Sequence, residues 1–240
     1  MRNAALLGAL LAVAGCGGTA SSPPASQPPR PAAGSAVPPV ARGPGPGPFG
    51  AELRRPTALR ARPRGRVLAR LARHTKFGSV QILAVARMRP GWLAVRSPLL
   101  PNARVGWIRA SDALLLHEPW TLDVDLSRRR LVARREGRRR FSIPVAIGTP
   151  ATPTPTGRFG VTDRLRMSGT TYGCCALALS ANQPHIAQGW GGGTRIAIHG
   201  TTAVGSIGTP ASHGCLRASD AGLRRLLAVI PLGATVHIHA

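Results

Sequence analysis

The residues best suited to chemistry lie in one short segment near the C-terminal end, residues 212–217, which read SHGCLR. A thiol and an imidazole one residue apart project to the same side of an extended backbone, so Cys215 and His213 could enter one cleft. A cysteine beside a base is the arrangement that nucleophilic catalysis needs. Gly214 would let a substrate backbone approach, and a helix starting soon afterwards would favour a thiolate. Taken alone, this short pattern leaves a structural or metal-binding role at least as open.

The residues around this segment favour the catalytic role over the structural and metal-binding ones. A second histidine, His199, ends the strand-like run RIAIH and precedes His213 by 14 residues, and residues 152–159 read TPTPTGRF. Together with SHGCLR these features resemble the YkuD-type L,D-transpeptidases. Their pattern is a histidine, a spacer of about this length, Ser/Thr-His-Gly-Cys and, after one more residue, Arg or Asn. The resemblance covers residues 119–240, which is half of the chain.

The resemblance implies roles for individual residues. Cys215 would be the nucleophile and His213 the general base, oriented by a backbone carbonyl, as is usual in this family. Backbone N–H groups around Gly214 and Cys215 would form the oxyanion hole. His199 and Arg217 would hold or polarise the substrate.

Two further residues have expected supporting roles. Ser212 would fix the local turn through its hydroxyl. Tyr172 would line the glycine-rich region 167–193, which is similar to the cover of the family's active site; a packing role is the equal alternative for Tyr172.

The implied reaction is acyl transfer on the peptide stems of peptidoglycan, without a metal or other cofactor. Cys215 would attack the carbonyl before the terminal D-Ala of a tetrapeptide, and an amine of a neighbouring stem would resolve the thioester into a 3→3 cross-link. With water as acceptor, the same site would be an L,D-carboxypeptidase. Attachment of a protein to the wall, a non-catalytic wall-binding module and a basic nucleic-acid binder are the other candidates.

The N-terminal residues predict where the protein works. Arg2, the apolar run 4–14 and the small residues before Cys16 are typical of a signal peptide with a lipobox over residues 1–16. Cys16 would then carry lipid and hold the protein on the outer face of the membrane; an ordinary cleaved signal is the alternative. Residues 17–50 are rich in Pro and Gly, which predicts a disordered tether reaching into the cell wall.

Two mainly β units are expected after the tether. Short β-like runs at 66–69, 80–85, 91–95 and 105–108 resemble a small bacterial SH3-like barrel over residues 51–118. Alternating runs at 121–126 and 141–148, with a turn at residues 136–137, predict a β-rich sandwich over residues 119–240. RIAIH and ATVHIH would be further strands. One main helix is expected from residues 219–220 to 230.

Charge and the remaining metal-binding side chains have plainer explanations. The net charge is +24, and the arginine run 128–140 indicates either attraction to anionic wall polymers or a solvated hairpin. Export from the cell and few aromatic residues argue against nucleic acid as the partner. Cys174 and Cys175 are expected as buried thiols rather than a disulfide. His237 and His239 are expected to be ordinary strand residues, and a zinc site built from His199, His213 and Cys215 matches no common motif.

Overall fold

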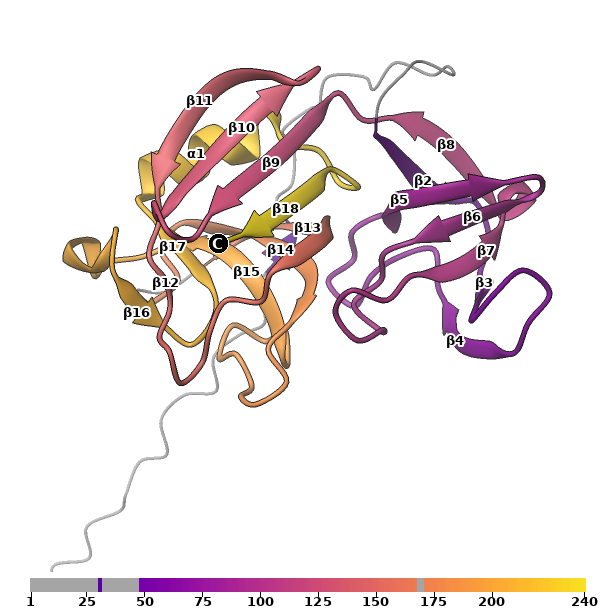
Figure 1. Cartoon of the computed structure of the whole chain (residues 1–240), viewed down its shortest axis with the longest axis horizontal. Helices are drawn as coiled ribbons and strands as arrows, with labels where there is room; N and C mark the ends of the chain where they lie inside the picture. The colour runs from indigo at the N-terminus through magenta and orange to yellow at the C-terminus, as the bar shows by residue number, and fades with distance from the viewer. Residues whose placement is uncertain (1–29, 32–47, 168–170) are drawn as a thin grey trace, which may run out of the picture.

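The structure is a computed structural model that describes residues 30–31, 48–167 and 171–240 (Figure 1). The described residues are mainly β with a single α-helix among them, which confirms the predicted fold class. The signal peptide and Cys16 lie outside the described residues. Within the described ranges, no helix has the length and apolar character needed to cross a membrane.

The first unit is a seven-stranded sheet with the order β4-β3-β7-β6-β5-β2-β8 and its own core, shown in purple and magenta in Figure 1. Its elements are β2 (Phe49–Leu53), β3 (Thr57–Arg60), β4 (Val67–Leu71), β5 (Ile82–Arg89), β6 (Trp92–Val95), β7 (Gly106–Arg109), η1 (Ala110–Asp112) and β8 (Ala113–His117). The four predicted runs fall on β4 to β7. Trp107 of β7 is buried. The SH3-like character of this unit stays a prediction.

The expected tether overlaps with ordered structure at two places. β2 already begins at Phe49, two residues before the predicted start of the first unit. Arg30–Pro31 form β1, which pairs with Arg166 and Leu165 of the second unit. This pairing is available because the C-terminal half of β13 (Gly157–Arg166) extends past its partner β18, which pairs only with residues 157–160. A strand edge left unpaired readily accepts another extended segment.

The second unit contains a nine-stranded sheet with the order β11-β10-β9-β18-β13-β14-β15-β17, with β1 beside β13. Its elements are β9 (Trp120–Asp125), β10 (Arg130–Arg135), β11 (Arg138–Pro144), β13, β14 (Cys175–Asn182), β15 (Arg195–Gly200), β17 (Leu216–Ala218), α1 (Asp220–Val229) and β18 (Thr235–His239). A small parallel pair, β12 (Ile147–Gly148) with β16 (Pro210–Ser212), and the 3₁₀ turn η2 (Val204–Ser206) complete it. Buried side chains from both ends of the large sheet share one core, so the sheet folds over into a sandwich.

Local chemistry explains why these elements form where they do. Leu122 and Val124 alternate with polar neighbours and are buried in the core, as the period-two pattern predicts. Glu136 and Gly137 both have positive φ, the geometry of a tight two-residue hairpin turn between β10 and β11. Ser219 caps α1 by accepting a hydrogen bond from the Gly222 N–H at 3.2 Å. The helix packs against β14 and β15, the strands that lie beside the SHGCLR segment.

Candidate active site

Cys215 lies immediately before β17, the edge strand that pairs in parallel with β15. Its side chain is 3% exposed. The sulfur accepts from the Ala197 N–H at 3.4 Å and donates to Gln188 Oε1 at 3.3 Å. Burial raises the pKa of the Cys215 thiol to about 12, against the opposing effects of the Ala197 N–H and the Arg217 charge. The helix-favoured thiolate expected from the sequence is therefore not the resting state, because burial outweighs the nearby positive charge.

His199 is the second buried reactive group, and it lies near the end of β15 with 2% of its surface exposed. Its Nδ1 is 2.6 Å from the Gly200 carbonyl oxygen. A carbonyl can only accept, so Nδ1 carries the proton and Nε2 keeps a free lone pair. The pKa of His199 is lowered to about 4. Burial is the main cause and the Arg217 charge adds to it, while the hydrogen bond to Gly200 acts in the opposite direction. The ring is therefore neutral at neutral pH and can accept a proton at Nε2.

Tyr172 and Arg217 connect these two groups. The Tyr172 and His199 rings meet edge to face, with centroids 5.0 Å apart. Burial raises the pKa of Tyr172, and the charge of a Cys215 thiolate raises it further. Arg217 is the register partner of His199 across β15 and β17. The structure thus brings together four residues that the sequence analysis had selected.

His213 lies apart from this cluster. The residue is exposed and sits in a bend rather than in a strand. Gly214 has a φ of 112°, so the backbone between His213 and Cys215 is not extended. The expectation that the two side chains share one side therefore does not hold, since one is exposed and the other buried. Within the described part of the chain, the His213 ring makes no hydrogen bond, although its carbonyl accepts from Gln188 Nε2 at 3.0 Å.

The turn around Gly214 is held by two hydroxyl groups. Ser212 Oγ accepts from the Gly214 N–H at 3.1 Å and donates to the Cys215 carbonyl at 2.5 Å. Thr154 Oγ1 donates to the Gly214 carbonyl at 2.9 Å and accepts from the Gly148 N–H at 2.8 Å. Because the Gly214 N–H is already used, the Cys215 N–H is the better candidate donor to an oxyanion. Thr154 belongs to the TPTPTGRF run, but its role was not predicted from the sequence.

Gln188 is the main site residue that sequence reasoning missed. Its carboxamide nitrogen donates to the His213 carbonyl and, at 3.4 Å, to the Ile186 carbonyl. These contacts turn its oxygen toward the Cys215 thiol. No motif distinguishes this glutamine, and only its place in the glycine-rich cover region could have drawn attention to it. Two residues later, Trp190 stacks on Phe77 of the first unit, with ring centroids 5.5 Å apart.

The expectation of two buried thiols at Cys174 and Cys175 is wrong. The structure joins them in a disulfide between neighbouring residues. Cys174 is only half-buried, and its N–H donates to Asp220 Oδ1 at 3.0 Å. Of the three cysteines in the described residues, Cys215 is the free one.

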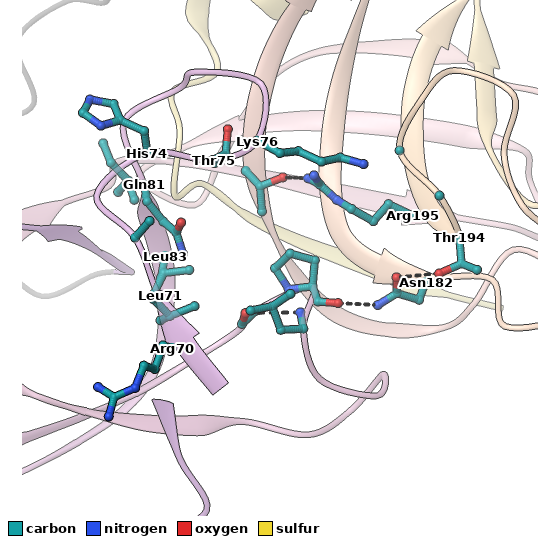
Figure 2. A pocket seen from close by; sticks show the side chains of 18 residues that line it. Arg70, Leu71, His74, Thr75, Lys76, Gln81, Leu83, Asn182, Thr194 and Arg195 are labelled. Atoms are coloured by element: carbon teal, nitrogen blue, oxygen red, sulfur yellow. Dashed lines mark hydrogen bonds between the residues drawn. The ribbon is translucent and has the colours of Figure 1, made fainter. Parts of the chain in front are cut away.

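A cavity of about 420 Å³ lies between the two units (Figure 2). Figure 2 shows Arg70, Leu71, His74, Thr75 and Lys76 on the side of the first unit and Asn182, Thr194 and Arg195 on the side of the second. Asn182 joins the two walls by donating to the Pro98 carbonyl of the first unit at 3.1 Å, and on its own wall it accepts from Thr194 Oγ1 at 3.1 Å. Residues 192–195, which line the cavity, continue the loop that carries Gln188, so the cavity adjoins the loop that contacts Cys215.

Solved structures of two L,D-transpeptidases match part of this chain. The catalytic domain of the Enterococcus faecium L,D-transpeptidase is 20% identical and covers 51% of this chain and 98% of that one, with a TM-score of 0.41. L,D-transpeptidase 3 of Mycobacterium tuberculosis is 14% identical and covers 57% of this chain and 74% of that one, with a TM-score of 0.45.

Sequence comparison identifies the second unit. The YkuD protein of Bacillus subtilis (strain 168), a proposed L,D-transpeptidase, is 31% identical over 121 residues, which are 50% of this chain and 66% of the relative. Its counterpart in Bacillus licheniformis is 32% identical over 120 residues, again 66% of the relative. The chain thus spans just under two thirds of the length of these relatives. The family model for the YkuD L,D-transpeptidase catalytic domain matches residues 119–238, half of the chain, and the chain belongs to this family.

Proposed function

We propose that the protein is an extracytoplasmic L,D-transpeptidase that forms 3→3 cross-links in peptidoglycan through a thioester on Cys215. The observation that carries this proposal is that a buried thiol, Cys215, and a buried imidazole, His199, both interact with Tyr172 and Arg217. The imidazole has its Nδ1 proton fixed on the Gly200 carbonyl, so Nε2 is the ring nitrogen that would accept the thiol proton. A nucleophile with an oriented base is what acyl transfer requires.

We assign the general base to His199, in place of the His213 expected from the sequence. A backbone carbonyl orients His199, whereas His213 is exposed and its ring has no such contact among the described residues. Both His199 and Cys215 interact with Tyr172 and Arg217. His213 then remains at the open side of the nucleophile, where it can contact the substrate.

The proton and bond changes balance over two steps. As the Cys215 sulfur attacks the carbonyl before the terminal D-Ala, its proton passes to His199 Nε2 and a C–S bond forms. The C–N bond then breaks, and the leaving D-Ala amine takes the proton from His199. In the second step an acceptor amine attacks the thioester and gives a proton to His199, which returns it to the departing Cys215 sulfur. The Cys215 N–H would donate to the oxyanion in both tetrahedral intermediates.

Arg217 is suited to hold a carboxylate of the donor stem. Its Nε is buried and has no hydrogen-bond partner among the described residues. A buried donor without a partner costs free energy, and a substrate oxygen would relieve that cost. Arg217 also lies beside His199 in the register of β15 and β17.

Location and further partners follow from the expectations for the rest of the chain. Lipid on Cys16 would anchor the protein to the outer face of the membrane, and the tether and the SH3-like unit would extend it into the wall. Six of the eight arginines of residues 128–140 lie on β10 and β11, and Arg128 and Arg129 lie in the turn just before β10. All of them but Arg134 are exposed, which suits contact with anionic wall polymers.

The decisive experiment is the intact mass of the protein after incubation with a carbapenem, whose β-lactam carbonyl can acylate a thiol. We expect an increase by the mass of the compound that is lost in Cys215→Ala. It should persist when Cys174 and Cys175 are both replaced by alanine. A folded protein that forms no adduct would contradict the proposal. Incubation of a tetrapeptide stem with and without an amine acceptor would then separate cross-linking from carboxypeptidase activity or protein attachment.

A further inference from the structure

A cluster of metal-binding side chains lies outside the active site, on the paired strands β9 and β18. These strands run in parallel with His237 opposite Asp123, and His239 follows on the same face two residues later. His239 Nε2 is 3.3 Å and His237 Nδ1 3.7 Å from the nearest carboxylate oxygen of Asp123. One ligand atom from each of the three residues lies within 4.8 Å of the others. In the described residues, this is the one group of three such side chains.

The His239 ring is already oriented as a metal ligand would be. Its Nδ1 is 2.9 Å from the Ala240 carbonyl oxygen, which can only accept a hydrogen bond. The Nδ1 proton is therefore fixed there, and Nε2 faces the Asp123 carboxylate, to which it donates when protonated; a bound metal ion would take the place of that proton. Histidine ligands usually donate their second ring N–H to such an outer oxygen. If the three side chains lay together only by chance, the His239 ring would not need to have this orientation.

We propose that Asp123, His237 and His239 bind a divalent transition-metal ion, with Zn²⁺ as the expected occupant. Two imidazole nitrogens and a carboxylate oxygen form a donor set that Zn²⁺ accepts, and water would complete a tetrahedral shell. All three side chains are between 32% and 39% exposed, so an ion can reach them from solvent. This assignment departs from the expectation that His237 and His239 are ordinary strand residues.

The surrounding charges are of both signs and limit the affinity rather than exclude the ion. Asp125 lies beside His239 in the strand register, although Ser127 and the Arg128 backbone already occupy one of its oxygens. Arg158 of β13 is the register partner of His237 on the other side. The site would therefore hold its ion more weakly than a buried zinc site does.

The proposed ion would join the first and last strands of the catalytic unit. β9 opens this unit and β18 closes it, and both belong to the same sheet. Because the ligands are brought together only when these strands pair, the ion would bind the folded state and stabilise it.

The test is a calorimetric titration of the purified chain with ZnCl₂, together with its thermal unfolding. We expect one site, a rise in the unfolding temperature with Zn²⁺ and its reversal by a chelator. His239→Ala and Asp123→Asn should each weaken zinc binding by more than about 10- to 100-fold, because losing a ligand costs more than losing the outer contacts for which that range is known. His185→Ala is the matched control and should bind as the unaltered protein does.

Two outcomes would overturn the proposal. The first is zinc binding that His239→Ala and Asp123→Asn leave unchanged, and the second is binding that disappears in Cys215→Ala. Co²⁺ gives a readout that does not depend on variants. Its absorption in the unaltered chain should show tetrahedral nitrogen and oxygen ligands without a thiolate charge-transfer band, and such a band would place the ion on a cysteine.

Discussion

At the scale of single residues, the site rests on two groups that are both neutral at neutral pH. Burial raises the pKa of Cys215 to about 12 and lowers that of His199 to about 4. A preformed thiolate–imidazolium pair is therefore disfavoured. In the proposed mechanism, proton transfer would have to accompany the attack on the carbonyl, so the position of the His199 Nε2 lone pair would decide the rate.

The two histidines should respond differently to substitution. Loss of a general base costs about 10²- to 10⁴-fold in rate, so His199→Gln should slow carbapenem acylation by that amount. His213→Gln should have a smaller effect, mainly on how the acylation rate depends on the carbapenem concentration. In the unaltered protein, acylation should increase as the pH rises through about 4, where His199 loses its proton. Stopped-flow kinetics of the two variants would decide the assignment, and the reverse order of effects would return the base role to His213.

Gln188 should restrain the nucleophile. Its oxygen accepts from the Cys215 thiol, which stabilises the protonated form. Gln188→Ala should therefore lower the pKa of Cys215, and each unit of decrease raises the thiolate fraction at neutral pH about tenfold. Alkylation by iodoacetamide measures this directly. Gln183→Ala is the control, since Gln183 lies in the same loop and donates to the Pro153 carbonyl instead. Slower alkylation of Gln188→Ala would contradict the restraint.

Residue types and spacing predicted part of this site. Cys215, His199, Tyr172 and Arg217 were selected from the sequence, and the structure groups them. The side on which His213 lies was not predictable, because it depends on the φ of Gly214. Gln188 was missed because its contact with Cys215, 27 positions later in the sequence, depends on how the intervening loop folds.

At the scale of elements, strands with strong local patterns were predictable and strands defined by distant partners were not. β9 and α1 showed their alternation and cap in the sequence. β2 and β8 did not, since β8 reads ALLLH without alternation and pairs with β2 from the other end of the unit. β3 is only four residues long and lies between β4 and β7.

The junction between β8 and β9 contains a buried acid. Glu118 is fully buried, and neither carboxyl oxygen has a hydrogen-bond partner in the described part of the chain. Burial raises the pKa of Glu118 from 4.5 to about 8. The folded state therefore holds this proton more tightly than the unfolded state does. Its contribution to stability is fully present below pH 4.5 and is lost as the pH rises toward 8.

Glu118→Gln should remove this pH dependence. The free energy of unfolding of the unaltered protein should fall between pH 4.5 and 8, by an amount on the order of a few kcal/mol. The variant should show a flatter profile and gain relative stability at the alkaline end. Urea unfolding at several pH values measures both slopes. Glu52→Gln, at a partly exposed residue paired with Arg54, should keep the original slope, and an unchanged slope in Glu118→Gln would refute the argument.

At the scale of the whole molecule, the first unit is built into the catalytic unit. Phe77 of the first unit belongs to the core cluster of the second and stacks on Trp190. Next to it, Lys76 Nζ donates to the Gly191 carbonyl at 2.7 Å. Thr75 donates to the buried carboxylate of Asp163, which also pairs with Arg195 at 2.8 Å. The segment 75–77 thus supports the loop that brings Gln188 to Cys215.

This support predicts that a change in the first unit reaches the nucleophile. Phe77→Ala should destabilise the protein by about 3 to 5 kcal/mol, the usual cost of removing a buried phenylalanine ring. It should also change the alkylation and acylation rates of Cys215 at temperatures where the protein stays folded, because the loop loses its stacking partner. Phe49→Ala is the matched control, since Phe49 packs edge to face on His117 within the first unit. If both variants lose stability but only Phe77→Ala alters Cys215 reactivity, the first unit positions the active-site loop. If Cys215 reacts equally fast in Phe77→Ala and Phe49→Ala, the first unit does not influence the reactivity of Cys215.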